Sequence, residues 1–96
     1  MKVEYSNRAL IDLRRAAADS REFGDAVAIA LEARIVAVVR RIAEHPKAAQ
    51  GVTDRPGIHV VPLLRYPYKI FSRVYEGRVR ILHIRHTSRQ PWPGKR

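Results

Sequence analysis

Residues 68–85 read YKIFSRVYEGRVRILHIR, and this stretch decides the fold. Side chains of contrasting character alternate on both sides of Glu76-Gly77, and a period of two is typical of β-strands. In the first half, one face would carry Tyr68, Ile70, Ser72 and Val74, and the other Lys69, Phe71, Arg73 and Tyr75. Glu-Gly is a serviceable two-residue hairpin turn. The stretch therefore predicts two antiparallel strands, residues 68–75 and 78–85.

Upstream of this hairpin, residues 58–65 are also strand-like, and Pro62 places them at a sheet edge or a bulge because proline cannot donate to the ladder. Tyr66-Pro67 turns the chain between the two strands. Turn-forming Pro46, Gly51 and Pro56-Gly57 predict a loop over residues 46–57.

Two helices are expected before that loop. Ser6 is a good N-cap for the first helix, which should end near Arg21. Its apolar positions are Leu10, Leu13 and Ala17, joined by Ile11 and Ala18, and its solvent side is Asp12, Arg14 and Arg15. The positions of its apolar residues predict which side of this helix packs on the sheet.

The second helix follows Gly24, with Asp25 as its expected N-cap. Its apolar residues recur every three or four positions: Val27, Leu31, Ile35, Val38 and Ile42. It should end before His45-Pro46, since the residue before proline avoids the α region. Two helices with a short connection form an antiparallel hairpin.

Residues 2–5 complete the pattern as a short strand with Val3 and Tyr5 on one side. The order strand, helix, helix and three strands (β-α-α-β-β-β) predicts an α+β fold in two layers, with the helical hairpin packed on a mainly antiparallel sheet. The 96 residues fit one domain over 1–96, with a basic C-terminal tail from about residue 90 to 96.

Composition excludes several classes of protein. The chain has no cysteine, which rules out a disulfide scaffold and a thiolate zinc site. No apolar run approaches the ~20 residues of a membrane span. The start of the chain lacks the apolar core of a signal peptide, so the expected compartment is the cytoplasm and no membrane partner is expected.

Charge is distributed unevenly in this chain of net charge +10. Residues 1–54 hold nine basic and eight acidic side chains, whereas residues 55–96 hold ten basic and one acidic. A field of one sign attracts oppositely charged molecules, so we expect an anionic partner, either a nucleic acid or an acidic protein.

No motif for metal, cofactor or hydrolase chemistry is present. His83 and His86 are three apart, which puts them on opposite faces of a strand and argues against a metal site. Ser72 lacks the glycine-rich elbow of a hydrolase nucleophile. Glycine-rich phosphate loops are also absent, so no cofactor is expected.

What remains is a basic set on and after the sheet: Arg65, Lys69, Arg73, Arg78, Arg80, Arg85, His86 and Arg89. Lys69 and Arg73 share a strand face with Phe71 between them, a mixture that suits phosphates with a stacked base or an acidic, partly apolar peptide. Arg78 and Arg80 are at least as well explained as solubilising charges.

The run from Arg65 to Tyr75, then residues 79–89 and Pro91-Trp92, resembles the ParE/RelE toxin superfamily of type II toxin–antitoxin modules. Residues 6–13 resemble the opening of that family's first helix, and residues 42–46 the end of its second. The resemblance implies a small antitoxin, whose disordered C-terminal segment wraps the toxin in a hetero-oligomer.

The resemblance implies two activities. RelE-like members cut mRNA on the ribosome, and by that likeness Arg73, Arg85 and His86 would be catalytic. ParE-like members poison DNA gyrase instead. Here the tail carries Trp92 where nuclease members often have a tyrosine; an indole cannot move a proton, which favours the ParE-like, growth-arresting activity.

For either target, or for the antitoxin, the expected contact residues are Arg65, Lys69, Phe71, Arg73, Arg85, Arg89 and Trp92. A basic nucleic-acid-binding module without toxicity is a further alternative, although no recognised DNA- or RNA-reading motif supports it.

Overall fold

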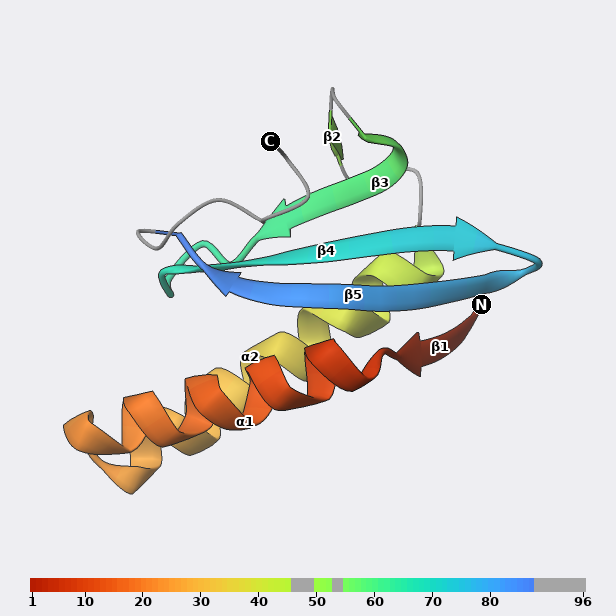
Figure 1. The fold of residues 1–96 in the computed structure, drawn as a ribbon. Coiled ribbons are helices and arrows are strands. Elements are labelled where there is room, and N and C mark those ends of the chain that lie inside the picture. Colours follow the sequence, from red (N-terminus) through yellow and green to blue (C-terminus); the bar gives the residue numbers. More distant parts are fainter. Residues whose placement is uncertain (46–49, 53–54, 88–96) are drawn as a thin grey trace.

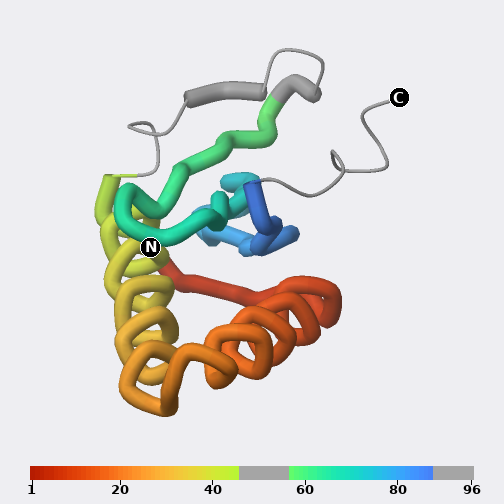
Figure 2. The backbone as a smooth tube through the Cα atoms, turned by 90° about the vertical axis from the view of Figure 1, so that its left-hand side faces the viewer, coloured from red at the N-terminus to blue at the C-terminus, as the bar shows by residue number. Residues whose placement is uncertain are grey.

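The computed structural model describes residues 1–45, 50–52 and 55–87, and it confirms the two-layer α+β architecture. Its elements are β1 (Lys2–Tyr5), α1 (Asn7–Ser20), a 3-10 turn η1 (Arg21–Phe23), α2 (Asp25–Glu44), β2 (Gln50–Val52), β3 (Arg55–Pro62), β4 (Tyr68–Tyr75) and β5 (Arg78–His86). The sheet order is β1-β5-β4-β3-β2, with β1 parallel to β5 and the other pairs antiparallel (Figure 1). Seen from the side, the two helices form one layer and the strands the other (Figure 2).

The β4–β5 hairpin matches its sequence pattern closely. β4 begins at Tyr68 and ends at Tyr75, as predicted, and β5 extends one residue further than expected, to His86. Glu76 and Gly77 both take positive φ angles, 50° and 73°, which is the twist that two-residue hairpins require.

The connection to β3 differs from the sequence prediction. Residues 46–57 were expected to form a loop, but β2 occupies Gln50–Val52 and β3 already begins at Arg55. β3 also ends at Pro62 rather than at residue 65, because the chain turns at Leu63, whose N–H donates to the Tyr68 carbonyl at 2.9 Å. Glycine at 57, with φ 84°, belongs to a strand, and its turn-like signal was misleading.

Pro62 does lie at an edge. It pairs with Lys69 of β4, whereas the pairing of β2 with β3 ends at Val60. Its missing N–H therefore breaks no ladder on that side.

The start of α1 is confirmed, whereas that of α2 is corrected. The Ser6 side chain accepts a hydrogen bond from the Ala9 N–H at 2.9 Å and caps α1. The residue that caps α2 is Gly24 and not Asp25, which is the first residue of the helix. Gly24 has φ 113°, a conformation that suits glycine and that an aspartate would adopt only with strain.

The buried side of α1 agrees with the prediction at Ala17, which is buried, and at Leu13, which packs against the core, and differs from it elsewhere. Leu10 and Ile11 are exposed, whereas Ala9, Asp12 and Ala16 are buried. Small side chains face the sheet because α1 lies close to β5. Asp12, expected on the solvent side, is the important exception to the apolar pattern and is treated below.

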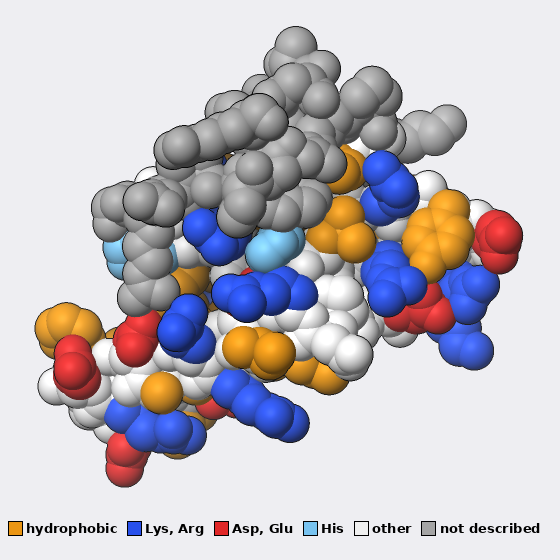
Figure 3. All heavy atoms as spheres, in the orientation of Figure 1, with side chains coloured by type: hydrophobic (Ala, Val, Ile, Leu, Met, Phe, Trp, Pro, Cys, Tyr) orange, Lys and Arg blue, Asp and Glu red, His pale blue; other side chains and the backbone are white. Residues whose placement is uncertain are grey.

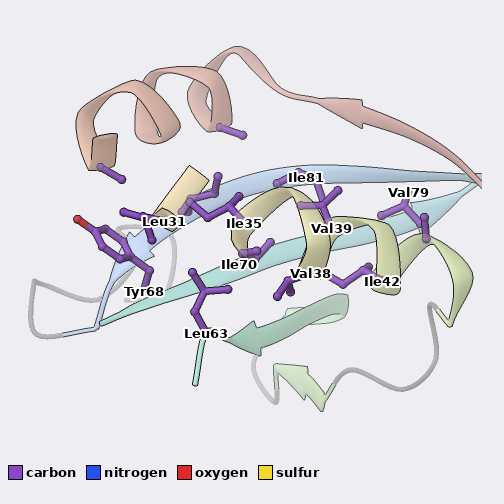
Figure 4. Close-up of a cluster of buried hydrophobic side chains, with 14 residues drawn as sticks. Leu31, Ile35, Val38, Val39, Ile42, Leu63, Tyr68, Ile70, Val79 and Ile81 are labelled. Atoms are coloured by element: carbon purple, nitrogen blue, oxygen red, sulfur yellow. The ribbon is translucent and has the colours of Figure 1, made fainter. Parts of the chain in front are cut away.

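The core fills the space between α2 and the sheet (Figure 4). Four of the five predicted α2 positions are buried, and Val27 is partly exposed. The cluster joins Leu31, Ile35, Val38, Val39 and Ile42 of α2 to Tyr68, Ile70, Val79, Ile81 and Ile84 of the sheet. The inner face of the sheet is thus fixed against the helices, and the opposite face, here called the outer face, is left for other contacts.

Candidate functional site

The outer face brings the basic residues of β4 and β5 together. Strand register pairs Lys69 with Arg85, Phe71 with His83, Arg73 with Arg80 and Tyr75 with Arg78. Directly paired residues project to the same side of a sheet, so all eight belong to the outer face. Figure 3 shows Lys and Arg side chains gathered over the strands and also along the helical hairpin, with acidic side chains among them.

A β-bulge in β5 places Arg85 on the outer face. Phe71 pairs with His83 and Ser72 with Ile81, so Leu82 is an extra residue on β5. Such a β-bulge shifts the alternation by one position. It returns Ile84 to the core and puts Arg85 on the same face as Arg73.

His86 lies elsewhere. It pairs with Tyr68, whose side chain is part of the core, and the two rings meet edge to face with centroids 5.1 Å apart. Of the three residues expected to be catalytic in a nuclease, Arg73 and Arg85 therefore share the outer face and His86 is on the inner side.

Phe71 is the aromatic centre of the outer face. The Lys69 ammonium lies 5.7 Å from its ring centroid, and the His83 ring meets it edge to face at 6.5 Å. Only 6% of Phe71 is exposed, although its side chain points away from the core cluster. The cation and the ring lie close enough for a cation–π interaction.

A cationic hollow lies beside Arg73. It has a volume of about 410 Å³ and is lined by Ser6, Arg73, Tyr75, Arg80 and Leu82. The Arg80 guanidinium donates a hydrogen bond to the Tyr75 hydroxyl at 3.2 Å, and this bond raises the pKa of Arg80 above its ordinary value. Two guanidinium groups in a hollow that no carboxylate of the described residues lines suit a phosphate or a carboxylate of a partner.

Arg78 is neutralised within the sheet. It forms ion pairs with Glu4 at 2.8 Å and with Glu76 at 3.2 Å. Within the described residues, Arg73 has no such carboxylate partner. On the outer face, Arg78 is thus paired with carboxylates near β1, whereas Arg73 can meet the carboxylate or phosphate of a partner.

Asp12 is a residue that the sequence reading missed. It is only 5% exposed. Its Oδ2 accepts a hydrogen bond from the Ile84 N–H at 3.0 Å and lies 3.2 Å from His83 Nδ1. Its Oδ1 forms an ion pair with Arg8 Nε at 3.1 Å. Burial lowers the pKa of His83, and the negative charge of Asp12 partly opposes this shift. Its spacing from Ala9 and Ala16, three and four residues, is the signal that could have placed it on the buried side.

The other predicted contact residues are more scattered. Arg65 is exposed in the turn between β3 and β4 and does not line the hollow. Arg89 and Trp92 lie outside the described residues. Within the described part of the chain, no group of three or more His, Asp or Glu side chains is arranged to hold a metal ion. In that same part, every helix is too short or too polar to cross a bilayer.

Solved structures similar to this chain are toxins and toxin–antitoxin complexes. The chromosomal ParDE TA system from P. aeruginosa matches at 22% identity and a TM-score of 0.81, covering 92% of this chain and 97% of that one. The isolated E. coli RelE toxin matches at 18% identity and a TM-score of 0.62, covering 93% and 86%. The intact E. coli RelBE complex gives 18% and 0.62, covering 92% and 98%.

The fold is therefore that of the ParE/RelE toxins. The sequence model of the family described as ParE toxin of type II toxin-antitoxin system, parDE, matches residues 3–91, and the chain belongs to this family. No curated protein sequence matches it.

Proposed function

We propose that this toxin arrests growth in the cytoplasm by inhibiting DNA gyrase. The observation that carries the proposal is the cationic outer face, on which Arg73 and Arg85 stand beside Lys69 and Phe71, in a chain of the ParE family. An inhibitor that blocks its target needs an adhesive surface and no aligned set of proton-transfer groups. The exposed Arg73 and the partly exposed Lys69 and Arg85 provide such a surface for an acidic protein or for the DNA bound to it.

Purified gyrase tests the proposal directly. We expect the wild-type toxin to inhibit supercoiling, and Lys69→Glu with Arg73→Glu to raise the half-inhibitory concentration by about tenfold or more, as loss of central interface charges does. Arg40→Glu is the matched control, because Arg40 is an exposed arginine of α2 in the helical layer. Supercoiling that is undiminished at saturating wild-type toxin would reject gyrase as the target.

A second function, ribosome-dependent cleavage of mRNA, is favoured by one observation: Arg73 and Arg85 share the outer face, where both can stabilise a phosphoryl transition state. In that case, primer extension on mRNA from expressing cells shows cuts that Arg73→Ala and Arg85→Ala abolish. The cuts should persist in His86→Ala, because His86 lies on the inner side of the sheet.

Expression without any growth defect would instead favour a non-toxic nucleic-acid-binding module.

We further propose that a cognate antitoxin neutralises the toxin in a hetero-oligomer. The support is the family match and the likeness to ParDE and RelBE structures, together with a net charge of +10 that favours association with an acidic segment. A segment that is disordered when free can wrap such a surface and fold on binding.

A further inference from the structure

The side of α2 that faces away from the sheet is exposed and apolar. Of the eight large apolar side chains that are exposed in the described residues, six lie on the helical hairpin, so most of the exposed apolar surface belongs to the helical layer. On α2, Ile29 is 68% exposed and Val36 is 46% exposed. Figure 2 shows α2 at one edge of the helical layer, with α1 only on its other side.

Six residues form one continuous surface here, called the α2 strip. Each lies three or four residues from the next, and residues at these intervals are neighbours on a helix surface. Glu32 and Arg34, the charged residues within the same range, are only partly exposed and lie on either side of the strip. The strip consists of Ala26, Ile29, Ala30, Ala33, Val36 and Ala37.

The α2 strip has the chemistry of an interface. It runs for about 17 Å along the helix without a charged residue. The side of a surface helix that faces away from the core usually carries charged and polar residues. The centre of a protein–protein interface, in contrast, is depleted of charges. The strip is therefore suited to contact another protein surface rather than water.

The order of small and large residues in the strip fits a second copy of the same helix. When two α2 helices pack antiparallel about a two-fold axis at Ala33, residues equally far on either side of Ala33 face each other. Ile29 then lies opposite Ala37 of the other copy, and Val36 lies opposite Ala30. Each large side chain meets a small one, which allows the two surfaces to interdigitate.

Charges at the two ends of the strip select the same orientation. Asp25 precedes the strip and Arg40 follows it, and both are exposed. Antiparallel packing brings Asp25 of each copy near Arg40 of the other, so opposite charges meet at both ends. A parallel pair would place like charges together instead, which is unfavourable.

We propose that the toxin forms a two-fold dimer through the α2 strip, with the helices antiparallel. One face of about three helical turns is smaller than the ~800 Å² per partner of a standard interface, and two chains of net charge +10 repel each other. The dimer is therefore weak and forms at high concentration. The outer face lies on the other layer of the fold, so each copy keeps it free.

Sedimentation equilibrium of the complete toxin tests the dimer. In about 0.3 M salt, which screens the repulsion, the mass of the wild type should rise from 11.0 kDa towards twice that value between about 5 and about 200 µM. Ile29→Glu should raise the dissociation constant about tenfold or more, because it places a carboxylate in the apolar contact. Leu64→Glu is the matched control: Leu64 is 83% exposed in the turn after β3, outside the α2 strip, and this variant should dimerise like wild type.

Cysteine cross-linking tests the orientation. The chain has no cysteine, so a single introduced thiol can pair only with its copy in another chain. Ala33→Cys places the two thiols at the two-fold axis, within the ~7 Å between Cα atoms that a disulfide requires, and should give mostly covalent dimer on mild oxidation. Leu64→Cys, at a more exposed position, should remain mostly monomeric under the same conditions.

Three results would overturn the proposal. They are a wild type that stays monomeric at about 200 µM, a dimer that Ile29→Glu leaves unchanged, and a Leu64→Cys protein that cross-links as completely as Ala33→Cys. Self-association is measured without gyrase or antitoxin. A monomeric wild type would therefore leave the proposed target untouched, and undiminished supercoiling would leave the dimer untouched.

Discussion

On the side of β5 that faces away from β4, the first and second halves of the strand are covered in different ways. From Arg78 to Ile81, β5 pairs with the parallel strand β1. Beyond Ile81, α1 replaces the strand, and side chains make the bonds: the Ser6 hydroxyl donates to the Leu82 carbonyl at 3.0 Å and Asp12 Oδ2 accepts from the Ile84 N–H at 3.0 Å. Both halves satisfy backbone groups that burial would otherwise leave unpaired.

The difference lies in which part of the chain carries the bond. Backbone pairing in the first half tolerates many side chains, because every residue but proline offers an N–H and a carbonyl. The second half depends on two particular side chains at the start of α1. We therefore expect substitutions of the side chains that bond to the second half of β5 to lower the stability of the protein. Three such substitutions are taken in order, from the largest expected effect to the smallest.

Asp12→Ala should have the largest effect. It leaves the Ile84 N–H without an acceptor and removes the partner of Arg8 and His83, so we expect the free energy of unfolding to fall by about 3 kcal/mol. A domain of this size has only about 5–10 kcal/mol in total. Urea unfolding followed by circular dichroism measures the loss.

Two further variants show which part of Asp12 matters. Asp12→Asn keeps an oxygen acceptor for Ile84 and should retain about half of the stability that alanine loses. Asp25→Ala, at the exposed first residue of α2, removes an acidic residue near a helix start and should cost less than about 1 kcal/mol. An Asp12→Ala protein as stable as Asp25→Ala would show that α1 does not hold this edge.

Ser6→Ala should have an intermediate effect. One hydroxyl caps α1 by accepting from Ala9 and also donates to Leu82, so both bonds are lost together. We expect a loss of about 1.5 kcal/mol in the same unfolding measurement. Ser6→Thr keeps the hydroxyl and should recover most of it; equal losses for alanine and threonine would point to packing around Ser6 as the cause.

Most of the fold could be predicted from local patterns. The alternation in residues 68–85 and the three- and four-residue spacing in α2 identify the elements that build the core. Ser6 could be named as a cap from its type and place. These features are readable because each is set by neighbours in the sequence.

The edge and the site depend on long-range contacts instead. Asp12 seemed solvent-exposed because its bond partner, Ile84, is 72 residues away. The extra residue Leu82 leaves no signal in the sequence, yet it decides that Arg85 and not His86 joins Arg73 on the outer face. β2 was missed because turn-forming residues surround a strand of three residues.

His83 offers the smallest effect and tests how the side-chain half of the edge is held. Asp12 contacts it, and Arg8 and Arg85 are the other charges that act on it. Burial lowers the pKa of His83 below its ordinary value of 6.5, more than Asp12 raises it. The unfolded chain therefore binds more protons near pH 6 than the folded protein does, and stability must fall as the pH drops through that range.

We expect His83→Gln to lose less stability than wild type between pH 7.5 and pH 5.5, as measured by urea unfolding at both pH values. A wild-type protein that instead gains stability from His83 on acidification would mean that the charge of Asp12 outweighs burial, and that an ion pair reinforces the hydrogen bond to Ile84.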